Sequence, residues 1–244
     1  MDLPAPAPDR PRVIALIPAH DEAPRIAAVV RGTAAHLPVL VVDDGSTDGT
    51  AAVAREAGAD VLELRPNAGK GAALRAGFRH ALAGGCDAVV TLDADGQHDP
   101  AEIPALLAAL AAPRAPGSAP PDLVVGKRDF RRMPPVRRVA NVLGGRAFSW
   151  AVGEHVPDNQ SGYRLVGRRL MEASLTSDER GFQFEVEMLA TCLARGWLIA
   201  WVPVRTIYAG EPSHIRPAAH LRHFIGAVVA ARRMVRGARR AAAR

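Results

Sequence analysis

The sequence predicts an α/β protein with a mostly parallel central sheet flanked by helices. Two observations carry this prediction. Short apolar runs that suit buried strands alternate with longer helical segments through the first half of the chain. A polar segment follows each of the first four runs, and in a parallel sheet such segments meet at the carboxyl edge, where ligands gather.

Four strand–helix pairs can be assigned in order. Strands are expected at residues 13–17, 39–42, 61–64 and 89–92. The paired helices are expected at 24–35, up to about 57, at 72–83 and at 101–111. Further strands are expected at 122–126 and 198–204, with a helix from 182 to about 195 between them.

The length of 244 residues suits one main domain with a sizeable core. Residues 1–11 are rich in proline and are expected to be a disordered lead-in, and residues 113–121 read as a surface loop. The main domain is expected at 12–217 and a basic helical tail at 218–244. Two cysteines far apart indicate neither a disulfide framework nor a zinc site, which fits a reducing cytoplasm.

Charge is distributed unevenly along the chain. The net charge is +6, and eight arginines but no acidic residue follow Glu211, so removing those eight leaves the body at −2. The tail is therefore the source of the basic character. Lysine occurs only as Lys70 and Lys127, which makes the positions of both informative.

Asp93 and Asp95 follow the fourth strand, and Gly96 turns the chain directly after them. Two carboxylates held close together repel each other, and a divalent cation relieves that repulsion. Gln97 offers a further, neutral oxygen. The pattern indicates a metal site, although Asp-x-Asp pairs also occur in acidic loops and helix caps.

Three other segments follow strand ends, at residues 18–22, 43–50 and 67–71. The small residues around Lys70 leave backbone N–H groups accessible, and Lys70 adds an ammonium, so this segment suits phosphate binding. All three segments also suit turns and helix caps. Neither the P-loop spacing nor a G-x-G-x-x-G after the first strand is present. A nucleotide site with a metal-bound diphosphate is the interpretation that remains.

These segments together resemble family 2 glycosyltransferases, in particular the dolichyl-phosphate mannose synthase-like, polyprenyl-phosphate branch. The matching stretches are IPAHDE, VVDDGSTDG, NAGKG and LDADGQH, which begin at residues 17, 41, 67 and 92. The resemblance implies a GT-A fold, a Rossmann-like sheet that transfers a sugar from a UDP- or GDP-linked donor, usually with inversion. One departure is Asp21, where the family more often has Asn.

Carried over by position, the resemblance implies a donor nucleotide site and a metal site. The metal, Mg²⁺ or Mn²⁺, would bind Asp93, Asp95 and Gln97, and Asp95 is a catalytic candidate through that metal. As a Lewis acid, the metal would neutralise the charge that develops on the departing nucleoside diphosphate. The donor site comprises Pro18, Ala19, His20, Glu22, Asp44, Gly69, Lys70 and Asp93.

A basic cluster follows the strand expected at 122–126, where lipid-phosphate-using relatives bind the acceptor phosphate. A solvated basic face is the alternative interpretation. Asp158 lies in the segment DNQSGYR, which resembles the family's acceptor-site motif, and is the second catalytic candidate. Whether Asp158 is a base or only orients groups stays open, since a phosphate monoester is largely dianionic at neutral pH. The expected acceptor residues are Arg128, Arg137, Arg138, Asn141, Arg164 and Arg216.

Two acidic residues, Glu185 and Glu187, begin the helix expected from residue 182. Either they face the site or they favour the helix N-terminus electrostatically.

Residues 218–240 are expected to form an amphipathic basic helix that suits an anionic membrane surface. Docking on the chain's own domain or on a second subunit is the alternative. No segment reaches the roughly 18 apolar residues of a spanning helix, so we expect a peripheral protein on the cytoplasmic face, which leaves room for a separate membrane partner. The apolar stripe comprises Leu221, Phe224, Ile225, Val228, Val229 and Val235.

The favoured function is therefore metal-dependent transfer of a sugar to a lipid phosphate. The same chemistry on a soluble saccharide or small hydroxyl compound is the first alternative. A nucleic-acid-binding protein is disfavoured because the body is slightly acidic and contains no nucleic-acid module. A sugar-nucleotidyltransferase is disfavoured because its Gly-rich, Arg-containing signature is missing at the first strand.

Overall fold

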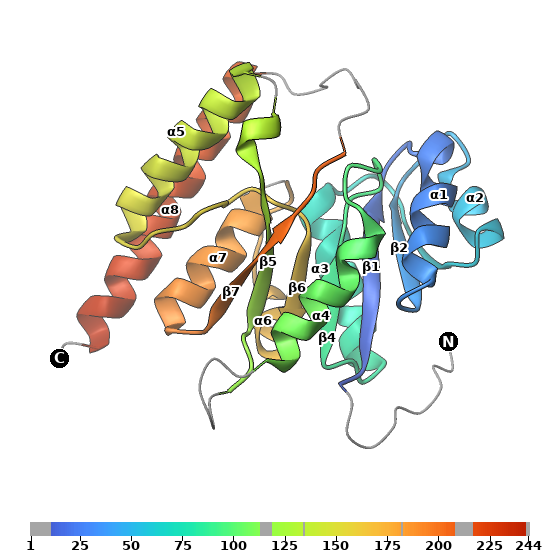
Figure 1. Ribbon diagram of the computed structural model, residues 1–244, viewed down its shortest axis with the longest axis horizontal. Coiled ribbons are helices and arrows are strands. Elements are labelled where there is room, and N and C mark those ends of the chain that lie inside the picture. The colour runs from blue at the N-terminus through green and yellow to red at the C-terminus, as the bar shows by residue number, and fades with distance from the viewer. Residues whose placement is uncertain (1–10, 113–118, 134, 182, 208–216, 243–244) are drawn as a thin grey trace.

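A seven-stranded sheet forms the centre of the described part of this computed structural model (Figure 1). The structure describes residues 11–112, 119–133, 135–181, 183–207 and 217–242. Residues 1–10 of the expected lead-in lie outside these ranges, and so does Arg216. The strands are β1 (Val13–Ala19), β2 (Val39–Asp44), β3 (Asp60–Leu64), β4 (Ala88–Thr91), β5 (Leu123–Arg128), β6 (Arg164–Gly167) and β7 (Ile199–Val204).

The strand order is β3-β2-β1-β4-β6-β5-β7. The neighbours β3, β2, β1 and β4 are parallel, β6 runs antiparallel to β4 and β5, and β7 is parallel to β5. The sheet is thus mostly parallel, as expected. Because the chain leaves β1 toward β2 and later returns on its other side as β4, the carboxyl ends of these strands border a crevice of the kind that binds ligands.

Helices cover both faces of the sheet (Figure 1). One face packs against α1, α2 and α4, and the other against α3, α6 and α7, with α5 and α8 further out. The α-helices are α1 (Ala23–Ala34), α2 (Thr50–Glu56), α3 (Lys70–Ala83), α4 (Ile103–Ala111), α5 (Pro135–Val152), α6 (Arg168–Ser174), α7 (Gln183–Arg195) and α8 (Pro217–Ala242). Two 3₁₀ turns, η1 (Pro100–Glu102) and η2 (Phe130–Arg132), precede α4 and α5.

The central strands β1 and β4 are buried on both sides because helices cover both faces of the sheet. Successive residues alternate between the two cores: Leu16 packs on the α3 side, whereas Ile17 packs on the α1 side. The same alternation sends Asp43 and Asp44, at the end of β2, to opposite faces. The buried sheet therefore supports the polar carboxyl edge rigidly.

Helix α8 is docked on the domain along one of its sides. It packs against α7 and α5, and Ala231 and Val235 are buried in the same core as β1. The stripe expected from the sequence is consequently divided, because Ile225 and Val229 remain 54% and 42% exposed. In the described residues, no helix is both long and apolar enough to cross a membrane.

Candidate functional site at the carboxyl edge of the sheet

Hydrogen bonds join the loops that follow β1 and β2. The Asp21 N–H donates to Ser46 Oγ over 2.9 Å, and the Thr47 N–H donates to Asp21 Oδ1 over 2.8 Å. Asp21 has a φ of +53°, a left-handed conformation that Asp and Asn tolerate better than most residues. Since Asn also has an Oδ1 acceptor, the Asp found here preserves the role that the more common residue would have in this loop.

Pro18 and Ala19 form the end of β1, and the exposed His20 follows them. Glu22 is half-buried; its N–H donates to Thr50 Oγ1 over 2.8 Å, and its carboxylate pairs with Arg25 at 2.9 Å. All four sequence-predicted residues of this segment therefore lie at the carboxyl edge, on the β1 side of the crevice.

Asp44 holds the loop that leads into α3. Its two carboxylate oxygens accept the Ala68 and Gly69 N–H groups, each over 2.8 Å, and its side chain is buried. Gly69 has a φ of +92°, and a side chain there would collide with the Arg180 carbonyl. Only glycine suits this position, which sets the N-terminus of α3 at the carboxyl edge of the sheet.

Lys70, the first residue of α3, lies between two carboxylates. Its Nζ is 2.6 Å from Asp93 Oδ1 and 2.8 Å from Glu185 Oε1. Glu185 comes from α7 and is buried, whereas the Asp93 side chain is 30% exposed. Burial alone would lower the pKa of Lys70, but attraction by Asp93 and Glu185 outweighs it and raises the pKa above its usual value. Lys70 is therefore charged.

Asp93 is ionised for the converse reason. Burial tends to raise its pKa, yet the charge of Lys70, followed by smaller contributions, lowers the pKa to about 2. The Cβ of any residue replacing Gly162 would lie 2.9 Å from both Asp93 carboxylate oxygens and 3.0 Å from Glu185 Oε1. The backbone at Gly162 thus packs directly on this cluster.

The turn after β4 is held by hydrogen bonds of its own. Gln97 donates its N–H to Asp95 Oδ1 over 2.9 Å, and Asp93 donates its N–H to His98 Nδ1 over 3.0 Å. His98 is buried and stacks on Tyr163, with 5.0 Å between ring centroids. Burial lowers the pKa of His98 to about 4, so the ring is neutral at pH 7 and Nδ1 is free to accept.

On the other side of Asp93, Arg128 at the end of β5 pairs with Asp158. Its Nε and Nη2 donate to the two Asp158 oxygens over 2.8 and 2.9 Å, and Asp158 is 1% exposed. This bidentate pair brings one expected acceptor residue and one expected catalytic residue together. The pair fixes the Arg128 guanidinium and the Asp158 carboxylate relative to each other.

The remaining acceptor candidates have different environments. Arg164 is fully buried and donates to the carbonyls of Ser161 and Glu185, so it ties the segment before β6 to helix α7. Arg137 and Arg138 lie in the first turns of α5, where Arg138 is exposed, and Asn141 of the same helix contacts Met133 Sδ. The structure thus separates Arg164 from the exposed arginines.

Glu185 and His98 are the residues that the sequence predictions underrate. In α7, Glu185 lies on the same buried stripe as Met188, Leu189 and Cys192, while Glu187 bonds Ser177 away from Lys70. A charged residue on an otherwise apolar stripe is the signal that could have identified Glu185. His98 gave no such signal, because its neighbours Asp93 and Tyr163 are brought to it only by folding.

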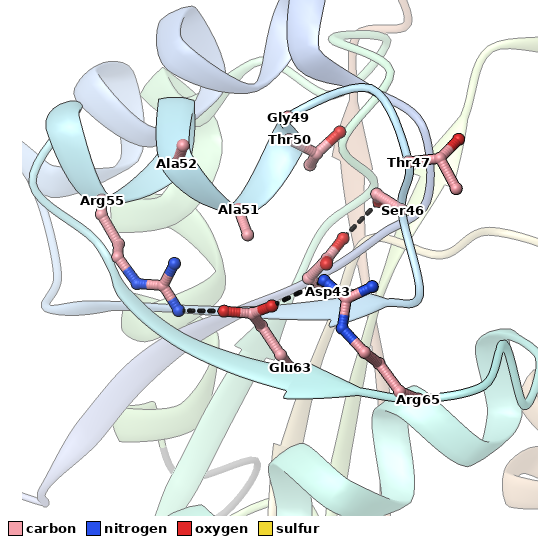
Figure 2. A pocket seen from close by; sticks show the side chains of 10 residues that line it. All are labelled: Asp43, Ser46, Thr47, Gly49, Thr50, Ala51, Ala52, Arg55, Glu63 and Arg65. Atoms are coloured by element: carbon pink, nitrogen blue, oxygen red, sulfur yellow. Dashed lines mark hydrogen bonds and ion pairs between the residues drawn. The ribbon is translucent and has the colours of Figure 1, made fainter.

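A cavity of about 510 Å³ lies between α2 and the sheet edge and is open to solvent (Figure 2). Arg55 and Arg65 reach Glu63 at its mouth, and Asp43 bonds Ser46 at its inner end. Neither Lys70 nor the Asp93–Asp95 turn lines this cavity. It is therefore separate from the carboxylate–lysine cluster.

Comparisons with known proteins identify the family of this chain. The sequence model described as Glycosyl transferase family 2 matches residues 14–173. A polyprenol monophosphomannose synthase of Mycolicibacterium smegmatis is 33% identical over 217 residues, covering 82% of this chain and 79% of that protein. An undecaprenyl-phosphate mannosyltransferase of Micrococcus luteus is 32% identical over 211 residues, covering 79% and 82%.

Among solved structures, glucosyl-3-phosphoglycerate synthase from Mycobacterium tuberculosis in complex with UDP superposes with a TM-score of 0.71 at 25% identity. The match covers 91% of this chain and 80% of that one. The fold is the expected GT-A fold. On its sequence and its architecture, the chain belongs to glycosyl transferase family 2 and is a glycosyltransferase.

Proposed function

We propose that this glycosyltransferase moves a sugar, with inversion, from a nucleotide-diphosphate donor to a polyprenyl-phosphate-type lipid, using a divalent metal ion. The observation that carries the proposal is the convergence of the Asp93–Asp95 turn, Lys70 and Arg128 at one sheet edge. The relatives named for polyprenol and undecaprenyl phosphate support the acceptor, and the UDP complex of the structural neighbour supports the donor.

The Asp93–Asp95 turn suits Mg²⁺ or Mn²⁺. Mg²⁺ is commonly held by one or two carboxylates together with substrate phosphates. In the described residues, no three His, Cys, Asp or Glu side chains gather as a complete metal cage. Asp93 already attracts one cation, Lys70, and Gln97 lies beside Asp95. Asp93, Asp95 and Gln97 would hold the ion, which as a Lewis acid would stabilise the departing nucleoside diphosphate.

For the donor, the chain supplies an anion-binding edge. The positive end of the α3 dipole lies at this edge, beside the Lys70 ammonium, and Asp44 fixes the loop that leads into the helix. The loops after β1 and β2, tied by Asp21 and Thr47, would border the base and ribose. The wall on the β1 side of that site would be formed by Pro18, Ala19, His20 and Glu22.

For the acceptor, Asp158 would keep the Arg128 guanidinium fixed where the phosphate arrives. Arginine matches phosphate geometry well, and a guanidinium held by a carboxylate loses little further freedom on binding. The phosphate oxygen would attack the anomeric carbon from the face opposite the leaving group. A dianionic phosphate needs no base, so Asp158 would orient and would not take up a proton.

The lipid would reach this site from a membrane that binds to a surface of the protein formed by α5 and α8. The two helices lie side by side at one end of the molecule (Figure 1) and together carry nine arginines and no acidic residue. Val139, Leu143 and Trp150 of α5, all on one helical face, are 57%, 59% and 71% exposed. Exposed apolar side chains bordered by arginine fit an anionic bilayer.

The proposed function is tested by incubating the protein with labelled UDP- and GDP-sugars, Mn²⁺ and either polyprenyl phosphate or a soluble saccharide. We expect labelled lipid with one donor, and loss of labelling when a chelator removes the metal. Labelling of the saccharide in place of the lipid would favour the soluble-acceptor function. Labelling that survives the chelator would overturn the metal assignment.

A further inference from the structure

Lys70 lies where two carboxylates of different roles meet. Asp93 belongs to the proposed metal turn after β4, whereas Glu185 belongs to α7 and is not part of that turn. Both contacts are of salt-bridge length, 2.6 and 2.8 Å, and the Lys70 side chain is only 14% exposed. The cluster is compact, because the backbone at Gly162 packs against both carboxylates.

An ammonium bonded to Asp93 competes with any other cation for that carboxylate. A divalent ion that binds Asp93 is repelled by the Lys70 ammonium, and this repulsion is relieved only if Lys70 moves away from Asp93. Moving a buried ammonium away from a carboxylate is costly unless another carboxylate receives it. Glu185 removes that cost, since it can keep Lys70 when Asp93 binds the metal. Lysine has a flexible stem and a compact charge, so it can shift between such neighbours.

We propose that Lys70 is a built-in competitor for the metal site and that Glu185 is the positioning residue that retains Lys70 when a divalent ion binds Asp93. The inference rests on the proposed function only in taking Asp93 as a metal ligand. Its consequence is that the protein without donor binds divalent ions weakly. Metal then enters effectively only together with the donor diphosphate, whose charge adds to that of Asp93 and Asp95.

The experiment measures Mn²⁺ binding to the full-length protein without donor, by the electron paramagnetic resonance signal of free Mn²⁺. Lys70→Met removes the competitor and should tighten binding roughly tenfold, an estimate based on one lost charge contact. Arg180→Met is the matched control. Arg180 is an exposed cation beside the α3 N-terminus, so this variant also removes one positive charge near the site but no contact to Asp93. It should change the affinity by less than about twofold.

Glu185→Gln tests the second half of the proposal. A metal ion entering this variant takes Asp93 from Lys70, and the glutamine in place of Glu185 offers no charged oxygen in exchange, so Mn²⁺ should bind several-fold more weakly than to wild type. If Lys70→Met does not fold, because Asp93 and Glu185 then face each other unneutralised, Lys70→Met/Glu185→Gln replaces it. That variant should bind Mn²⁺ more tightly than Glu185→Gln alone.

The outcomes separate this inference from the proposed function. Equal tightening by Lys70→Met and Arg180→Met would show a general charge effect, and no tightening would show that Lys70 does not compete; either result overturns the inference. Wild-type transferase activity that depends on metal would still uphold the proposed function in both cases. A wild type that is active without metal would instead overturn the assignment of the metal site itself.

Discussion

The guanidinium of Arg128 and the carboxylate of Asp158 form a bidentate pair with distances of 2.8 and 2.9 Å in a position where Asp158 is 1% exposed. Removing one partner of a buried ion pair leaves an uncompensated charge, which costs about 3–5 kcal/mol. We therefore expect Arg128→Met to destabilise the fold by about 3 kcal/mol in urea unfolding. Arg128→Met/Asp158→Asn should recover most of that loss. A single variant as stable as wild type would show that the pair is not coupled.

Asp95→Asn should abolish most of the activity while sparing the fold. The Asn Oδ1 can still accept the Gln97 N–H, so the turn is kept, but a charged metal ligand is lost. Because Lewis-acid stabilisation is worth several kcal/mol, kcat should fall on the order of a hundredfold or more. Asp99→Asn, in the same loop, should be near wild type. Near-normal kcat for Asp95→Asn at saturating donor would refute the metal assignment.

Arg138→Ala should weaken binding of the acceptor and leave binding of the donor unchanged. Arg138 is exposed at the start of α5, and losing one charge-assisted phosphate contact should raise the acceptor KM roughly tenfold. The comparison uses a short, soluble lipid-phosphate analogue, with Arg146→Ala further along α5 as the control. An equal loss of nucleotide affinity would place Arg138 on the donor side.

Protonation of His98 should make the fold less stable in mild acid. The pKa of His98 is about 4 in the fold and about 6.5 in an unfolded chain, so only the unfolded chain takes up this proton between those values. Stability from this group is thus full above pH 6.5 and is lost as the pH falls toward 4. From pH 7 to pH 5 the loss should be about 2 kcal/mol in metal-free urea unfolding.

His98→Asn should remove this pH dependence, since its Oδ1 can accept the Asp93 N–H without titrating. His80→Asn, at an exposed site on α3, should keep the wild-type dependence. Asp93 does not interfere, because its lowered pKa affects stability only below about pH 4. The assignment fails if His98→Asn loses as much stability as wild type over the same range.

The α5–α8 surface should bind anionic vesicles. We expect the protein to sediment with phosphatidylglycerol vesicles at low salt, to be partly released at high salt and to ignore phosphatidylcholine vesicles. Trp150→Ser should lower binding roughly tenfold, because a large apolar side chain no longer enters the bilayer. Truncation of α8 is a poor test, since Ala231 and Val235 belong to the core.

Vesicle binding by Trp150→Ser at the wild-type level would contradict this surface. If the wild type instead ignores phosphatidylglycerol and is a dimer that Trp150→Ser dissociates, a second copy covers α5 and α8. That result would favour transfer to a soluble acceptor.

The sequence by itself determined the α/β architecture, the carboxyl-edge location of the site and the family. These features are encoded locally: apolar runs define buried strands, and the Asp93–Asp95 turn and Lys70 each follow a strand end, so parallel pairing alone brings them to one edge. The antiparallel direction of strand β6 is not predicted by the sequence. Its short apolar run carries no information on direction.

Only the tertiary structure decided which side chains meet. Lys70 with Glu185, Arg128 with Asp158, and His98 with Tyr163 are pairs from separate elements, and no local pattern specifies such partners. The same limit applies to α8, where a period of 3.6 residues places apolar groups on a face without saying what covers it. Packing of one side of α8 against α7 and α5 buries Val235, whereas Ile225 lies outside that contact and stays exposed.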